Sequence, residues 1–124
     1  MGLNFGYVTP TGLEIEYFRA QWATNGGLLL WATRAEAGLV EFNLYRSTFS
    51  GAYGKRINPA AILPKAPPGQ GAQYSFSDGQ VAPGARVYYW LQVVGRDDVV
   101  IWLGPVAPVW PAMAFLPFIP VGGR

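Results

Sequence analysis

Glycine and proline interrupt this sequence so often that long helices are excluded. The chain has 16 Gly and 11 Pro among 124 residues, and both residue types destabilise the interior of a helix. The runs between these breaks are rich in β-branched and aromatic side chains, which favour strands. We therefore expect an all-β fold, and the length fits a single domain with a small core.

Six of these runs predict strands, because they alternate or are apolar and because they end at turn residues. The sequence Asn25-Gly26-Gly27 predicts one tight turn and Arg96-Asp97-Asp98 another. The Gly- and Pro-rich stretch 59–71 predicts a loop. The expected strands are residues 13–21, 28–33, 40–46, 74–77, 85–94 and 99–105. Short strands at this spacing predict a two-sheet antiparallel β-sandwich.

Several of these segments also carry a family resemblance. They are Leu28-Leu29-Leu30-Trp31, Phe42-Asn43-Leu44-Tyr45-Arg46-Ser47, Ile57-Asn58, residues 74–78, Val81-Ala82-Pro83-Gly84 and Tyr88-Tyr89-Trp90-Leu91. Together they resemble a fibronectin type III domain of the kind found in secreted bacterial surface proteins, over residues 13–108. The resemblance implies an immunoglobulin-like sandwich and an extracellular or cell-surface location. Val87 stands where the family has its corner tyrosine, so the hydrogen bond of that corner is not expected.

The segments outside the resemblance are both apolar. Residues 1–12 are expected to form an N-terminal extension, and residues 109–124 a proline-rich C-terminal tail, both outside the sandwich. The apolar part of the tail is interrupted by Pro111, Pro117 and Pro120 and is shorter than the ~20 residues that a spanning helix needs. We therefore expect no membrane span, and residues 1–10 do not have the pattern of a secretory signal.

The composition argues against catalysis and against metal binding. The chain has no His and no Cys, which removes the commonest general base, the commonest metal ligand and any disulfide. Glu14 and Glu16 share one strand face about 6.6 Å apart, and we interpret them as a solvated pair. Asp97 and Asp98 are interpreted as turn residues. We expect no catalytic residue, no metal site and no cofactor, and the scattered net charge of +2 gives no reason to expect nucleic acid.

Strand alternation assigns the side chains to faces. Leu29 and Trp31 are predicted to point inward, and Leu28, Leu30 and Ala32 outward. In the strand 85–94, Val87, Tyr89, Leu91 and Val93 are predicted to be buried. Tyr88, Trp90, Gln92 and Val94 then point outward. Tyr45 joins this outer set, because Phe42 and Leu44 take the inward positions.

An apolar outer surface on a chain with only 13% charged residues predicts an interaction site. The tail adds a second apolar element that could reach a neighbouring chain. The alternative is that the terminal segments fold back over these faces within one chain. The predicted interaction residues are Leu28, Leu30, Tyr45, Tyr88, Trp90, Phe115, Leu116, Phe118 and Ile119.

Three functions remain open from the sequence. The leading hypothesis is a non-catalytic, self-assembling subunit of an extracellular filament or surface layer, with copies of itself as partners. The second is a carbohydrate-binding accessory module in which Tyr45, Tyr88 and Trp90 form an exposed platform for glycans. The third is a minor subunit of a larger protein complex, which would use the same apolar surface for a different partner.

Overall fold

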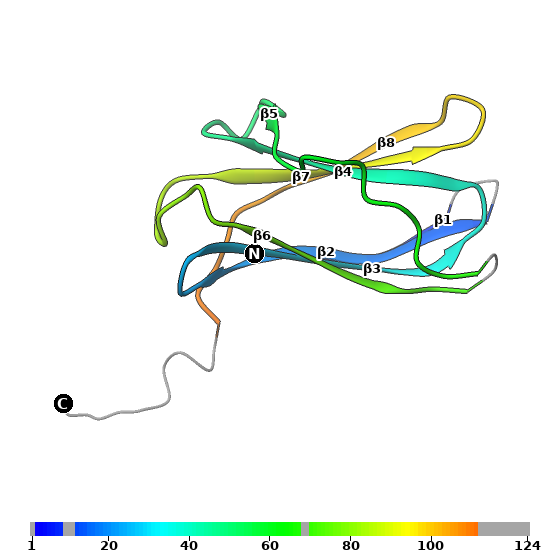
Figure 1. The fold of residues 1–124 in the computed structure, drawn as a ribbon, viewed down its shortest axis with the longest axis horizontal. Helices are drawn as coiled ribbons and strands as arrows, with labels where there is room; N and C mark the ends of the chain where they lie inside the picture. Colours follow the sequence, from blue (N-terminus) through cyan, green and yellow to red (C-terminus); the bar gives the residue numbers. More distant parts are fainter. Residues whose placement is uncertain (1, 9–11, 68–69, 112–124) are drawn as a thin grey trace.

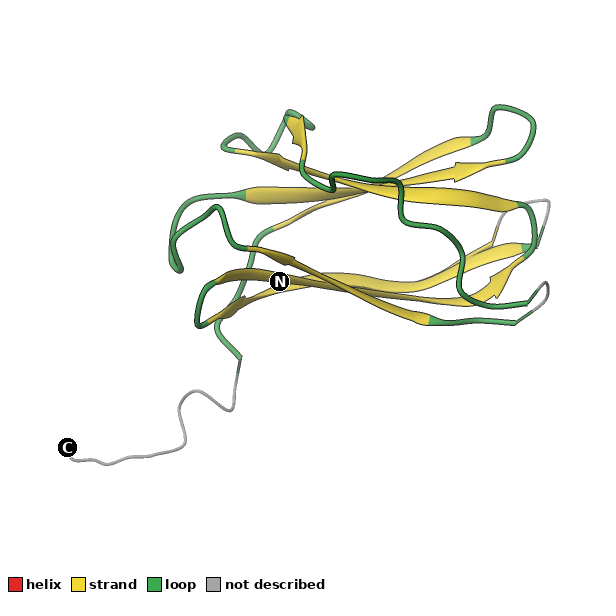
Figure 2. Ribbon diagram, viewed as in Figure 1, coloured by secondary structure: helices red, strands yellow, loops and turns green. Residues whose placement is uncertain are grey.

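The computed structural model describes the backbone of residues 2–8 and the backbone and side chains of residues 12–67 and 70–111. In these ranges the chain forms two layers of strands (Figure 1) and no helix (Figure 2). The strands are β1 (Gly2–Val8), β2 (Leu13–Ala23), β3 (Gly26–Glu36), β4 (Leu39–Ser47), β5 (Lys55–Arg56), β6 (Gln73–Asp78), β7 (Tyr88–Gly95) and β8 (Val100–Val106).

Each layer is one antiparallel sheet. The first sheet has the strand order β1-β2-β3-β6, and the second has the order β5-β4-β7-β8. The predicted all-β, two-sheet antiparallel sandwich is confirmed, and each of the six predicted strands has a counterpart. β7 begins at Tyr88 and not at residue 85, because a turn precedes it in which the Ala85 N–H donates to the Ala82 carbonyl at 3.1 Å.

The N-terminal segment belongs to the sandwich, which corrects the prediction that residues 1–12 lie outside it. β1 pairs antiparallel with β2, from Gly2 opposite Arg19 to Val8 opposite Glu14. Further along the same edge of β2, Val109 pairs with Gln21 in the parallel direction. The sequence prediction missed β1 although Leu3, Phe5 and Tyr7 alternate with Asn4 and Gly6, because the segment is short and contains two glycines. What decides its conformation is the free edge of β2, where its backbone finds hydrogen-bond partners.

The core lies between the sheets and is built around aromatic rings. Trp31 of β3 is fully buried, and it stacks on Tyr74 of β6 with ring centroids 5.4 Å apart. It also meets Phe42 of β4 edge to face at 5.6 Å, so the cluster joins the two sheets. Such rings supply much of the apolar area that a domain of this size can bury.

The predicted faces of β3 and β7 are correct with one exception. Leu29 and Trp31 are fully buried, as is every second residue of β7 from Tyr89 to Val93, while the residues between them are half-buried. Ala32 was predicted to point outward into solvent but is only 1% exposed. Its strand neighbours Tyr17 and Gln73 are larger, and a small side chain between them is shielded from water.

Candidate interaction surfaces

Four aromatic rings gather on the outer surface of the second sheet, and we call them the outer aromatic face. They are Tyr45 of β4, Trp90 of β7, Trp102 of β8 and Tyr53 of the loop between β4 and β5. The Tyr53 ring stacks on Trp102 with centroids 3.8 Å apart and planes 7° from parallel. Trp90 meets Tyr53 edge to face at 4.8 Å, and Tyr45 meets Trp102 in the same way at 4.9 Å.

Strand pairing explains how these rings meet. Tyr45 lies directly opposite Trp90, and Trp102 lies opposite Gln92, which is the next outward residue of β7. Tyr53 comes from a loop, and a hydrogen bond holds that loop against the sheet. The Trp90 Nε1 donates to the Ala52 carbonyl at 2.9 Å. The loop therefore adds an aromatic side chain to a surface that strand alternation alone would leave to three rings.

The sequence prediction located part of this face. Tyr45, Tyr88 and Trp90 lie on the outer side of the second sheet as predicted, and all three are half-buried. Trp102 and Tyr53 were missed. Alternation along β8 was the signal that could have placed Trp102. Nothing periodic marks Tyr53, because it lies in a Ser- and Gly-rich loop.

The outward residues of β3 do not join this face, so the predicted apolar outer surface is divided between the two sheets. Leu28 and Leu30 lie on the outer side of the first sheet, whereas the aromatic residues lie on the second sheet. The two leucines are half-buried, and their neighbours on β2 and β6 are polar. These neighbours are Arg19, Gln21, Ser75 and Ser77. Two isolated leucines among polar residues are ordinary surface and carry no binding argument of their own.

The carboxylates that the sequence singled out have structural neighbours. The exposed guanidinium of Arg34 in β3 forms ion pairs with both carboxylates, at 3.7 Å from Glu14 and 3.6 Å from Glu16. Asp97 and Asp98 form the turn between β7 and β8, as predicted. Within the described ranges, no three His, Cys, Asp or Glu side chains come together in a way that could hold a metal ion.

Two further carboxylates are buried, and each accepts several hydrogen bonds. Asp78 of β6 receives both of its closest contacts from the second sheet, where Arg46 Nη1 and the Tyr89 hydroxyl donate to it at 2.7 Å. Glu36 of β3 accepts from the Thr33 hydroxyl at 2.6 Å, from the Tyr74 hydroxyl and from the Ala66 N–H. Charged groups are buried only when they are paired or hydrogen-bonded. These contacts therefore explain why both carboxylates are buried, and they give both acids a structural role.

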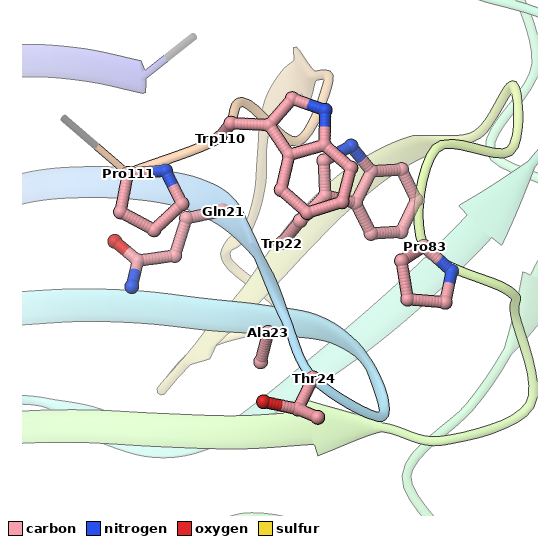
Figure 3. A pocket seen from close by; sticks show the side chains of 7 residues that line it. All are labelled: Gln21, Trp22, Ala23, Thr24, Pro83, Trp110 and Pro111. Carbon is pink, nitrogen blue, oxygen red and sulfur yellow. The ribbon is translucent and has the colours of Figure 1, made fainter. Parts of the chain in front are cut away.

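An apolar pocket of about 510 Å³ lies at one end of the first sheet (Figure 3). Its walls come from the end of β2, from the turn before β3, from the segment before β7 and from the chain that follows β8. The Trp22 and Trp110 rings lie side by side with centroids 6.1 Å apart and planes tilted by 41°. The lining residues are Gln21, Trp22, Ala23, Thr24, Pro83, Trp110 and Pro111. None of them was predicted as a site residue, since β2 and residue 110 meet only in the folded chain.

The predicted interaction residues of the tail lie outside the described residues. They are Phe115, Leu116, Phe118 and Ile119, and the described chain ends at Pro111 on the rim of the pocket. In the part of the chain that is described, there is no helix long and apolar enough to cross a membrane.

Comparison with family models, with curated proteins and with solved structures gave no match for this chain. The resemblance to fibronectin type III domains therefore stays a prediction.

Proposed function

We propose that this chain is a non-catalytic structural protein that assembles with copies of itself into an extracellular filament or surface layer. The observation that carries the proposal is the outer aromatic face. Four large rings are held together there on the solvent side of a sheet, and the outermost ring, Tyr53, is 43% exposed. Aromatic side chains presented in this way are enriched at the contacts between proteins.

The energetics favour covering this face. Burying the exposed part of one such ring contributes about 2 kcal/mol at ~25 cal/mol per Å² before ordering costs. Those costs are low here, because stacking and the Trp90 hydrogen bond already hold the rings in place. Phe49, on the same loop as Tyr53, is 71% exposed and extends the apolar surface. A preorganised apolar surface is the feature that tight protein contacts share.

The chemistry of the chain supports a non-catalytic role. The sequence has no His, and the buried Glu36 and Asp78 are engaged by hydrogen bonds that join parts of the fold. A nucleophilic serine needs a base within hydrogen-bond reach, and the buried acids are committed elsewhere. The location outside the cell rests on the resemblance to secreted surface proteins.

The carbohydrate-binding alternative has less support from the geometry. A sugar platform needs ring faces that are open to solvent, whereas Tyr45, Tyr88 and Trp90 are half-buried. Trp90 presents its plane at 87° to Tyr53, and the Tyr53 ring covers one face of Trp102. The arrangement fits a packed apolar surface better than a flat one.

The test is the size of the full-length protein across concentrations, measured by light scattering after size-exclusion chromatography and by negative-stain electron microscopy. We expect concentration-dependent regular oligomers or fibres. Tyr53→Ser combined with Phe49→Ser should weaken the association roughly tenfold or more, because interface hot spots each contribute over ~1 kcal/mol. Leu63→Ser is the matched control, since Leu63 is 63% exposed but lies on another loop. A chain that stays monomeric at all concentrations, or one that binds glycans through Tyr53, would contradict the proposal.

A further inference from the structure

The apolar pocket between Trp22 and Trp110 lies where the described chain ends. Pro111 lines the pocket, and thirteen residues follow it, 112–124. Its volume of about 510 Å³ lies within the ~300–1,000 Å³ that is usual for ligand sites. None of the lining residues is charged, and the polar groups of their side chains are the Gln21 amide, the Thr24 hydroxyl and the indole N–H of Trp22 and Trp110. The pocket therefore suits an uncharged, apolar occupant.

The residues that follow have the matching chemistry. From Ala112 to Val121 the sequence contains no charged residue, and it reads Phe-Leu-Pro-Phe-Ile-Pro over positions 115–120. A residue before proline is restricted to extended backbone, so Leu116 and Ile119 favour an extended chain. Extended proline-containing segments dock into grooves lined by aromatic rings, because little conformational entropy is lost on binding. Trp22, Trp110 and Pro83 provide such a groove.

Geometry disfavours the insertion of this segment into the pocket of its own chain. Phe115 is four positions beyond Pro111, a span of at most about 14 Å. To return to a pocket that Pro111 itself lines, the chain would have to reverse within Ala112-Met113-Ala114. That segment has no Gly, Pro, Asn, Asp or Ser, which are the residues that favour tight turns.

We propose that the Trp22–Trp110 pocket binds residues 115–120 of a second copy of this chain. This inference rests on the proposed self-assembly and adds the contact that joins two copies. The described chain ends at Pro111, which lines the same kind of pocket that the segment would fill in the partner. Both copies can therefore exchange their tails through one self-complementary contact, and a closed pair is the smallest assembled unit.

The absence of Cys from the sequence makes the contact directly testable. Thr24→Cys places one thiol on the pocket wall, at an exposed residue. Val121→Cys places one just beyond the docking segment and leaves residues 115–120 unchanged. The two full-length variants are mixed in equal amounts, oxidised mildly and separated by mass. We expect the mixed disulfide dimer to form several-fold in excess over either homodimer. Leu63→Cys replaces Thr24→Cys in the control mixture and should give no excess.

A double variant that carries both cysteines separates the two possible origins of the tail. Disulfide formation between chains supports the proposal. A disulfide within one chain shows that the pocket takes its own tail, which overturns the proposal and leaves self-assembly intact. Oligomers without any excess of the mixed dimer overturn the tail contact alone. A monomer with no crosslink overturns both this inference and the proposed function.

A second measurement avoids engineered thiols. Trp110→Ala removes one wall of the pocket at a residue that is 51% exposed, so the fold should be retained. Phe118→Ser removes a large apolar side chain from the tail segment that the pocket of the other copy would bind. Each variant should raise the concentration at which half of the chains are paired by about tenfold, and combining them should add little. Additive effects of the two variants would show that Trp110 and Phe118 do not meet.

Discussion

At the scale of single residues, two buried tyrosines carry the chemistry that responds to pH. Tyr89 donates its hydroxyl proton to Asp78, and Tyr74 donates to Glu36. Burial, followed by these hydrogen bonds to carboxylates, raises the pKa of both hydroxyls well above the usual value near 10. The protonated tyrosines therefore stabilise the folded sandwich relative to their ionised forms.

The stability of the protein is expected to fall in alkaline solution. The pKa of Tyr74 and Tyr89 is raised in the folded state, so above about pH 10 the unfolded chain binds fewer protons than the folded one. Their contribution is complete below that pH and is lost progressively as the pH rises further. Urea unfolding followed across this range should show a decreasing free energy of unfolding, and Tyr89→Phe should reduce the slope. A flat profile above pH 10 would contradict the assignment.

At the scale of elements, the turn between β7 and β8 is a point of local strain. Asp97 and Asp98 have φ of 59° and 61°, in the left-handed region that residues with a Cβ rarely adopt. The Val99 N–H donates to the Arg96 carbonyl at 3.3 Å and closes the turn, and the Gly95 N–H donates to the Val99 carbonyl at 2.8 Å. Two successive residues with positive φ are the central residues of a type I′ hairpin turn, in which Asn-Gly is the preferred pair.

Asp98→Gly should therefore stabilise the protein. Glycine adopts positive φ without steric cost, and part of that gain is offset by the greater freedom of the unfolded chain. We expect the free energy of unfolding to rise by about 0.5–1 kcal/mol, measured by thermal and urea unfolding. Ser75→Gly in β6 is the control, because it places glycine inside a strand and should destabilise instead. An unchanged or lower stability for Asp98→Gly would argue against the turn geometry.

At the scale of the whole molecule, an aromatic cluster and the buried hydrogen bonds of Arg46 and Tyr89 to Asp78 connect the two sheets. Trp31 and Tyr74 of the first sheet pack against Phe42 of the second. Arg46 of the second sheet donates to Asp78 of the first. The segment between β5 and β6 adds a further connection, because Ile62 exchanges backbone hydrogen bonds with Phe42 of the second sheet and the Ala66 N–H donates to Glu36 of the first.

Trp31→Ala should cost about 3–5 kcal/mol, because truncating a large core residue loses its burial and leaves a cavity. That loss is a large share of the ~5–15 kcal/mol typical of a folded domain. The variant should unfold at much lower urea concentration, with a strongly reduced midpoint in circular dichroism. Leu63→Ala is the matched control, since that side chain is 63% exposed and its loss should change stability by under ~1 kcal/mol.

The sequence by itself determined the class of fold and most of the strands. Alternation from Tyr88 to Val94 separates Tyr89 and Leu91, which are fully buried, from Tyr88 and Trp90. The same alternation placed Leu29 and Trp31 of β3 in the core. These predictions succeed because a side-chain period of two is a property of a single strand and needs no knowledge of its partners.

Only the tertiary structure decided which of these surfaces come together. It placed Leu28 and Tyr45 on opposite sides of the sandwich, brought Tyr53 from a loop onto Trp102, and joined Trp22 with Trp110 around a pocket. It also gave residues 2–8 the edge of β2 as a partner. Most of these contacts join segments far apart along the chain or depend on a loop backbone without periodicity, whereas β1 pairs with the next strand along the chain. Local patterning carries no information about such contacts, since strand pairing and sheet packing fix them.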